Sequence, residues 1–279
     1  MQGIFIVVAC ALCTMSAASA DILDKINETG RFAMGYRTDA PPFSYQSANE
    51  EPKGLAVSLC HDVVAEVKRE LQLAELKVTY VPVTARTRFQ KLEKGEIDIL
   101  CGPTTQTLSR RERMDFSIPY FIDGSSVVYR AGEVDSVEEL TGHRVGVLAG
   151  TTTAKIVAAL LADRKVDAEV VVYENHIKGL TALADGDVAA YFGDQAILRY
   201  QLGRMRPRTP LKFSSEQFSF EPYALALARG ETRFRLVVDH ALSRTFASGD
   251  IYEHVNTALG EVTLSDLALA VYQIVALPD

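Results

Sequence analysis

The chain has 279 residues, of which 48% are apolar and 23% charged, and its 36 acidic and 29 basic side chains give a formal net charge of −7. This composition excludes a disordered chain, and the length suits two domains or one large one. The negative charge offers no electrostatic footprint for nucleic acid or for an anionic membrane, so neither is an expected partner. An anionic ligand would have to be attracted by local arginines.

The first twenty residues have the pattern of a secretory signal peptide. Residues 4–12 are almost purely apolar, and the small residues Ala18 and Ala20 precede a cleavage point before Asp21. The apolar run is too short to span a bilayer stably. A lipoprotein signal ending at Cys10 is the minor alternative. We therefore expect residues 1–20 to be removed on export.

Export changes the meaning of the cysteines. Cys10 and Cys13 would leave with the signal peptide, so only Cys60 and Cys101 remain. Two cysteines in an oxidising compartment predict one disulfide, whereas two buried free thiols are the alternative.

Apolar stretches typical of strands alternate with amphipathic stretches typical of helices, which predicts an α/β fold with mainly parallel sheets. The clearest helix covers residues 55–71 and places Cys60 on its apolar face. Residues 92–98 and 183–189 repeat one pattern, a helix end, a glycine cap and an acidic step into a strand, which suggests two lobes. The predicted strands are 32–36, 78–83, 97–101, 126–129, 145–148, 170–173, 188–192 and 223–228.

Motifs for catalysis and for metal binding are missing from the sequence. It contains no H-E-x-x-H, G-x-S-x-G or G-x-x-x-x-G-K-[ST] pattern, and its five histidines lack metal-ligand spacing. We therefore expect no enzyme activity, no cofactor and no metal site.

Three loops at the carboxyl ends of predicted strands carry elements that bind anions. Residues 150–153 read Gly-Thr-Thr-Thr and open a helical stretch, whose first N–H groups are free to bind a carboxylate. Thr105 and His176 follow two other strands, at the sheet edge where open α/β folds bind ligands. Simple helix capping explains each loop equally well, so both interpretations stay open on these residues alone.

Six stretches, in order and covering nearly the whole mature chain, carry a family resemblance. They are GYRTDAPPFSY (35–45), VPVTARTRF (81–89), GEIDILCGPTTQTLSRRERMDFSIPY (95–120), GHRVGVLAGTTT (142–153), NHIKGLTALADGDVAAYFGD (175–194) and EPYALAL (221–227). Together they resemble the periplasmic amino-acid-binding proteins of ABC importers, solute-binding protein family 3, and most closely the glutamate/aspartate-binding group.

The resemblance implies a type II periplasmic binding protein fold with two α/β lobes joined by two crossover strands. Lobe 1 would comprise residues 21–127 and 223–279, and lobe 2 residues 128–222. The crossover strands are expected near 126–130 and 218–225. The resemblance also implies a periplasmic monomer that binds an amino acid and delivers it to a membrane permease.

Five residues of this sequence match family positions that bind the α-carboxylate and α-ammonium groups of the ligand. Arg110 matches the arginine that clamps the ligand α-carboxylate, and a guanidinium suits a planar carboxylate because it can bond both oxygens. Thr152 and Thr153 match its partners in lobe 2. Asp194 matches the acceptor of the α-ammonium group, with Thr105 as a second acceptor. Without the resemblance, Arg110 would be a solvated member of a charge run.

The distal end of the pocket would set specificity. Arg37 and Arg88 match the pair that binds the distal carboxylate of an acidic amino acid, and His176 fits a third donor. On the sequence alone, either arginine could instead pair at the surface with Asp39 or Glu93. Arg86 is close enough in sequence to be mistaken for Arg88.

Counting charges in the pocket supports an acidic ligand. Three arginines opposite Asp194 complement two carboxylates and one ammonium, and an amide would leave an arginine poorly paired. Two departures from the family pattern leave the ligand open, because Pro103 and Ala85 stand where serine and a polar residue are expected.

Two other functions fit the same resemblance. An enzyme on this fold, such as a cyclohexadienyl or arogenate dehydratase, would need an acid, and Glu221 or Asp194 could serve. A solute sensor that signals to a membrane receptor is the other alternative.

Overall fold

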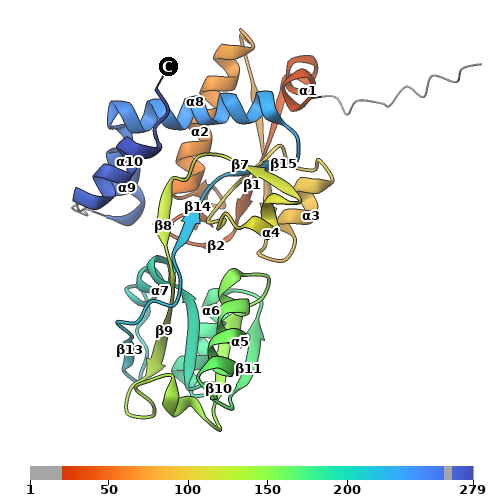
Figure 1. Cartoon of the computed structure of the whole chain (residues 1–279). Coiled ribbons are helices and arrows are strands. Elements are labelled where there is room, and N and C mark those ends of the chain that lie inside the picture. Colours follow the sequence, from red (N-terminus) through yellow and green to blue (C-terminus); the bar gives the residue numbers. More distant parts are fainter. Residues whose placement is uncertain (1–20, 261–265, 279) are drawn as a thin grey trace, which may run out of the picture.

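The computed structural model describes residues 21–260 and 266–278, which form two lobes, each built on its own five-stranded sheet (Figure 1). The expected signal peptide, with Cys10 and Cys13, lies outside the described residues. Within those residues, no helix combines the length and the apolar character needed to cross a membrane.

Lobe 1 is the larger lobe, and its sheet has the strand order β5-β1-β6-β15-β7. Strand β1 runs parallel to β5 and β6, whereas β15 is antiparallel to β6 and β7. A small sheet of β2, β3 and β4 lies after β1. The lobe 1 elements are α1 (Ile22–Thr29), β1 (Arg31–Arg37), β2 (Asp39–Ala40), β3 (Ser44–Gln46), β4 (Pro52–Lys53), α2 (Leu55–Glu70), β5 (Lys77–Val83), α3 (Arg88–Glu93), β6 (Ile99–Cys101), α4 (Leu108–Arg111), β7 (Met114–Phe116), β15 (Ala226–Ala228), α8 (Thr232–Ser248), α9 (Asp250–Leu259) and α10 (Asp266–Val275).

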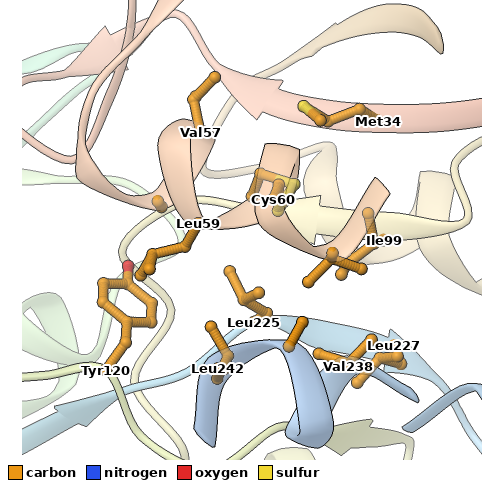
Figure 2. Close-up of a cluster of buried hydrophobic side chains, with 14 of the residues drawn as sticks. Met34, Val57, Leu59, Cys60, Ile99, Tyr120, Leu225, Leu227, Val238 and Leu242 are labelled. Carbon is orange, nitrogen blue, oxygen red and sulfur yellow. A yellow bond between two sulfur atoms is a disulfide. The ribbon is translucent and has the colours of Figure 1, made fainter. Parts of the chain in front are cut away.

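The core of lobe 1 joins segments that are far apart in sequence. Figure 2 shows side chains of the early helix α2 packed with Leu225 and Leu227 and with Val238 and Leu242 of α8. Cys60 is fully buried in this cluster and forms a disulfide with Cys101 at the end of β6, so the predicted bridge is confirmed and the free-thiol alternative is wrong.

Lobe 2 is continuous in sequence, and its sheet has the order β11-β10-β12-β9-β13. Strand β10 is parallel to β11 and β12, and β9 is antiparallel to β12 and β13. The lobe 2 elements are β9 (Ser125–Arg130), a 3₁₀ turn (Glu138–Leu140), β10 (Arg144–Leu148), α5 (Thr152–Asp163), β11 (Glu169–Tyr173), α6 (His176–Asp185), β12 (Ala190–Asp194), α7 (Gln195–Leu202) and β13 (Leu211–Phe213).

Two short strands connect the lobes. β8 (Phe121–Asp123) and β14 (Glu221–Tyr223) pair antiparallel and run between the two sheets (Figure 1). The second expected crossover contains β14, but the first was misplaced, because residues 125–130 form β9 inside the lobe 2 sheet. A three-residue strand such as β8 is too short to produce a periodic apolar signal.

Most predicted strands and the 55–71 helix have counterparts in the structure. Two predictions were wrong in detail. The single strand expected at 223–228 is divided between β14 and β15, and each large sheet is mixed rather than mainly parallel. The antiparallel strands arise where the chain enters lobe 2 or returns to lobe 1.

Candidate functional site

The candidate site lies where loops of the two lobes face each other. Across this cleft, the Thr105 and Thr152 hydroxyl oxygens are 3.4 Å apart. Gly150, in the left-handed conformation with a φ of +74°, approaches lobe 1 so closely that a Cβ would lie 2.9 Å from the Ala85 carbonyl oxygen. Of the eight predicted binding residues, Thr105, Arg110 and Thr152 line the interlobe cavity. The other five interact with one another or with residues of the cleft.

Arg37 is the last residue of β1 and is 98% buried, with a relative exposure of 2%. Its Nε donates a hydrogen bond of 2.8 Å to Asp39. The pairing with Asp39 considered from the sequence therefore exists, but within the protein and not on its surface. The count of pocket charges made from the sequence was incomplete, because it left out Asp39.

Arg88 begins α3 and is as deeply buried as Arg37. Its Nη1 donates a 3.0 Å hydrogen bond to the Pro103 carbonyl, while its Nε has no hydrogen-bond partner among the described residues. Burial lowers the pKa of Arg88, and the nearby positive charge of Arg37 lowers it further. Arg86 is exposed, which removes the confusion between the two arginines.

Arg110 is partly buried and lines the interlobe cavity. Its Nη1 donates a 2.7 Å hydrogen bond to the Thr105 carbonyl, and burial lowers its pKa. The guanidinium groups of Arg88 and Arg110 lie 4.6 and 5.0 Å from the centroid of the Phe89 ring, a cation–π arrangement. Phe89 thus holds two cationic side chains at one place in the cleft.

Glu221, at the start of β14, accepts hydrogen bonds from hydroxyl groups of both lobes. Its Oε2 accepts hydrogen bonds from Thr105 of lobe 1 and, at 2.6 Å, from Thr152 of lobe 2. Its Oε1 accepts from Ser125 and Ser219 at 3.0 and 2.9 Å. The carboxylate therefore lies on a connecting strand and bonds to side chains of both lobes.

A second acidic group lies beside the connecting strands. Asp194 ends β12 and accepts hydrogen bonds of 2.7 Å from Thr153 and 2.5 Å from the Tyr223 hydroxyl. The same hydroxyl lies 3.2 Å from Asp123 on β8. One phenolic proton cannot serve two carboxylates at once, so charge on both acids is unfavourable.

The pKa values of this acid pair follow from that arrangement. Burial, reinforced by the neighbouring Asp194, raises the pKa of Asp123 to about 7, although backbone N–H groups of Gly124 and Ala196 oppose the shift. Burial and the charge of Glu221 raise the pKa of Asp194. A cation placed here would favour the ionised forms of both acids.

His176 begins α6 after the capping residue Asn175 and is 3% exposed. Its Nδ1 lies 3.2 Å from the Tyr191 hydroxyl. Burial lowers its pKa to about 4, so the ring is neutral at physiological pH and offers one N–H donor.

A cavity of about 860 Å³ is lined by Thr105, Arg110, Thr152 and Glu221, among others, whereas the buried Arg37, Arg88, His176 and Asp194 are not among its lining residues. It opens between α4 of lobe 1 and the start of α5 in lobe 2. No cluster of His, Cys, Asp or Glu able to hold a metal occurs among residues 21–260 and 266–278.

Sequence reasoning missed four polar residues of the site. They are Asp39, Asp123, Glu221 and Tyr223. Glu221 was considered only as a catalytic acid, and Asp39 only as a surface partner of Arg37. Asp39, Glu221 and Tyr223 lie within the matched stretches, and Asp123 lies three residues after one of them. Their positions were therefore a signal, but acidic side chains in such places are usually solvated.

Comparison with known proteins agrees with this architecture. A family model described as bacterial extracellular solute-binding proteins, family 3, matches residues 32–261. The chain is 33% identical over 231 residues to the L-glutamate/L-aspartate-binding protein of Pseudomonas aeruginosa, which covers 82% of this chain and 76% of that protein. It is 26% identical over 234 residues to the glutamate/aspartate import solute-binding protein of Salmonella typhimurium, covering 84% of this chain and 78% of that one.

A solved structure of an ancestral arginine-binding protein bound to arginine superposes with a TM-score of 0.74 at 26% identity, covering 83% of this chain and 99% of that chain. The two-lobe fold of periplasmic binding proteins is thereby confirmed. On the family match and the 33% identity together, the chain belongs to the bacterial extracellular solute-binding proteins, family 3.

Proposed function

We propose that this protein captures an acidic amino acid, glutamate or aspartate, between its lobes and delivers it to the permease of an ABC importer. The observation that supports this most is the convergence of three buried or partly buried arginines, Arg37, Arg88 and Arg110, on a cleft whose other side carries Asp194. The names of two relatives as glutamate/aspartate-binding proteins support the same ligand class.

The α-amino-acid group would bind at the end of the cleft near the connecting strands. Arg110 would pair with the α-carboxylate, and Asp194 would accept the α-ammonium group, assisted by Thr105. Because the hydroxyls of Thr152 and Thr153 already donate to Glu221 and Asp194, these threonines would contribute the free N–H groups of the first turn of α5.

The distal carboxylate would bind between Arg37 and Arg88, with His176 of lobe 2 closing over it as a neutral donor. Contacts from both lobes are then completed only when the lobes approach each other. Ligand binding would therefore favour closure about β8 and β14, and the closed form would dock on the permease. We place the protein in the periplasm, as a monomer, after removal of residues 1–20.

We propose no chemical reaction at the site. Both oxygens of Glu221 already accept hydrogen bonds from hydroxyl groups of the protein, so neither is free to act on a leaving group. Incubation with prephenate provides the check, since turnover would show that the site is an active site.

Calorimetric titration of protein stripped of carried ligand by unfolding and refolding tests the binding function. Glutamate and aspartate should bind at least about a hundredfold more tightly than L-norvaline, which has no distal polar group, because Arg37 Nη2 and Arg88 Nε would stay buried without a hydrogen bond. Arg110→Ala should abolish binding of all three. Equal affinity for norvaline, or no heat from either acid in folded protein, would contradict the proposal.

A further inference from the structure

The distal end of the cleft contains an acceptor as well as donors. Among the described residues, the buried polar atoms that lack a hydrogen-bond partner include Arg37 Nη2, Arg88 Nε and Asp39 Oδ2. Arg37 Nη2 lies 2.8 Å from Asp39 Oδ1 as an ion pair, and Nε of the same side chain donates a hydrogen bond to that oxygen. Arg37 Nη2, Arg88 Nε and Asp39 Oδ2 are thus buried without a hydrogen bond to any described residue.

The two arginines are held side by side by consecutive residues of lobe 1. A Cβ on Gly102 would lie 3.1 Å from Arg37 Cγ, so the Arg37 side chain passes directly over this glycine. The next residue, Pro103, accepts the hydrogen bond of Arg88 through its carbonyl. Their unpartnered nitrogen atoms therefore belong to one place in the cleft.

Asp39 lies at the same end, facing lobe 2. It begins β2, and β2 packs against α6, the helix that His176 begins. Burial lowers the pKa of Arg88 and of His176, and the nearby negative charge of Asp39 opposes this shift in both. The side chain of Asp39 is only 13% exposed, so this charge is poorly screened by water.

The charge of Asp39 changes which side-chain group of a ligand can bind at the distal end of the cleft. Two guanidinium groups by themselves would form a site with donors only, which suits a carboxylate. With Asp39 present, one positive charge is neutralised and the site offers donors together with an acceptor. A carboxylate has only acceptors, whereas an amide has a carbonyl acceptor and an NH₂ donor.

We propose that Asp39 is a specificity-determining residue that admits an amide as well as a carboxylate, so that the ligand class comprises the acidic amino acids and their amides. The amide carbonyl accepts from Arg37 or Arg88, and the amide NH₂ donates to Asp39 Oδ2. This inference rests on the proposed function, because it assumes that an amino acid binds with its side chain at this end.

The simpler role for Asp39 is to position Arg37. That role predicts that a change at Asp39 alters the affinities for acid and amide together, whereas a specificity role predicts that their ratio changes. Asp39→Asn separates the two, because the amide oxygen of Asn can still accept from Arg37 Nε while its NH₂ replaces the free carboxylate oxygen.

The test is calorimetric titration of wild type and Asp39→Asn with L-glutamate and L-glutamine, using Asp163→Asn, a change at an exposed acid of α5, as the matched control. Wild type should bind glutamine within about tenfold of glutamate. In Asp39→Asn the ratio of affinities should move toward glutamate by at least about tenfold, and Asp163→Asn should leave it unchanged.

Three results would overturn the inference. A wild-type preference for glutamate above about a hundredfold would show that Asp39 does not admit the amide, whether or not the variant folds. An unchanged ratio in folded Asp39→Asn, with glutamate still bound, would leave Asp39 a positioning residue and the proposed function intact. Failure of wild type to bind either ligand would reject the proposed function and this inference with it.

Discussion

The hydroxyl of Thr152 in lobe 2 donates a 2.6 Å hydrogen bond to the carboxylate of Glu221 on the connecting strand β14. The same carboxylate oxygen accepts a hydrogen bond from Thr105 of lobe 1. Approach of the lobes thus forms a protein–protein hydrogen-bond network beside the cleft.

Glu221→Gln should weaken this network. One of the two acceptor oxygens is replaced by NH₂, so two of the four donating hydroxyls lose their acceptor. We expect a loss of about 2 to 3 kcal/mol in the free energy of unfolding and a more open protein without ligand. Urea unfolding and small-angle scattering measure the two effects. Glu96→Gln, at an exposed acid, is the control, and equal stability and radius of gyration in both variants would contradict the prediction.

Gly150→Ala should impair closure more than folding. Alanine at this left-handed position is strained by about 1 kcal/mol, and its Cβ would also meet the Ala85 carbonyl across the cleft. Gly142 has a similar φ of +81° with no heavy atom within 4 Å of its Cβ position, so Gly142→Ala is the matched control. Both variants should lose similar thermal stability, but only Gly150→Ala should bind glutamate more weakly. Equal affinities would show that lobe 2 relaxes around the added methyl group.

The acid pair should make stability depend on pH. Burial raises the pKa of Asp123 from 3.8 to about 7 in the folded protein. Between these values the folded state keeps a proton that the unfolded chain has lost, so this group stabilises the protein below about pH 4 and progressively less as the pH rises to 7.

Asp123→Asn isolates that contribution, because the amide stays neutral at every pH. The stability of the variant relative to wild type should rise from pH 4 to about 7 and then level off, and the difference cancels other titrating groups such as His176. Urea unfolding at a series of pH values provides the measurement. Parallel curves for the two proteins would mean that folding does not raise the pKa of Asp123.

Loss of the disulfide should lower stability without changing the binding site. Cys60 and Cys101 are 41 residues apart, and closing a loop of this size stabilises a protein by about 4 kcal/mol in the chain-entropy model. The double variant Cys60→Ala, Cys101→Ala should therefore unfold at lower urea but bind glutamate as wild type does, since β1 still pairs with β6. Reduction of wild type should reproduce the lower stability and should not affect the double variant. A large loss of affinity would show that the bridge also holds Arg37 and Arg88 in place.

The sequence predicted most helices and strands and the arginines of the cleft. It did not predict which buried acidic side chains lie beside those arginines. Runs of apolar residues located β1 and β10 closely, because each buries side chains over several residues, and they also located β5 and β11, which lie at the edges of their sheets. The short strand β8 produced no such pattern. Asp39 was visible two residues after Arg37, yet its burial depends on the docking of α6, which local sequence does not encode.

Strand β15 lies between β6 and β7 in the lobe 1 sheet, although more than a hundred residues of chain separate it from both. When the chain becomes available from its amino terminus onward, every strand of the lobe 2 sheet is present before β15. Until β15 arrives, the edges of β6 and β7 that face each other stay unpaired. Unpaired edges of this kind recruit other chains. We expect lobe 2 to assemble first and lobe 1 to be the slow, aggregation-prone half of the molecule, because its folding waits for residues 226–228.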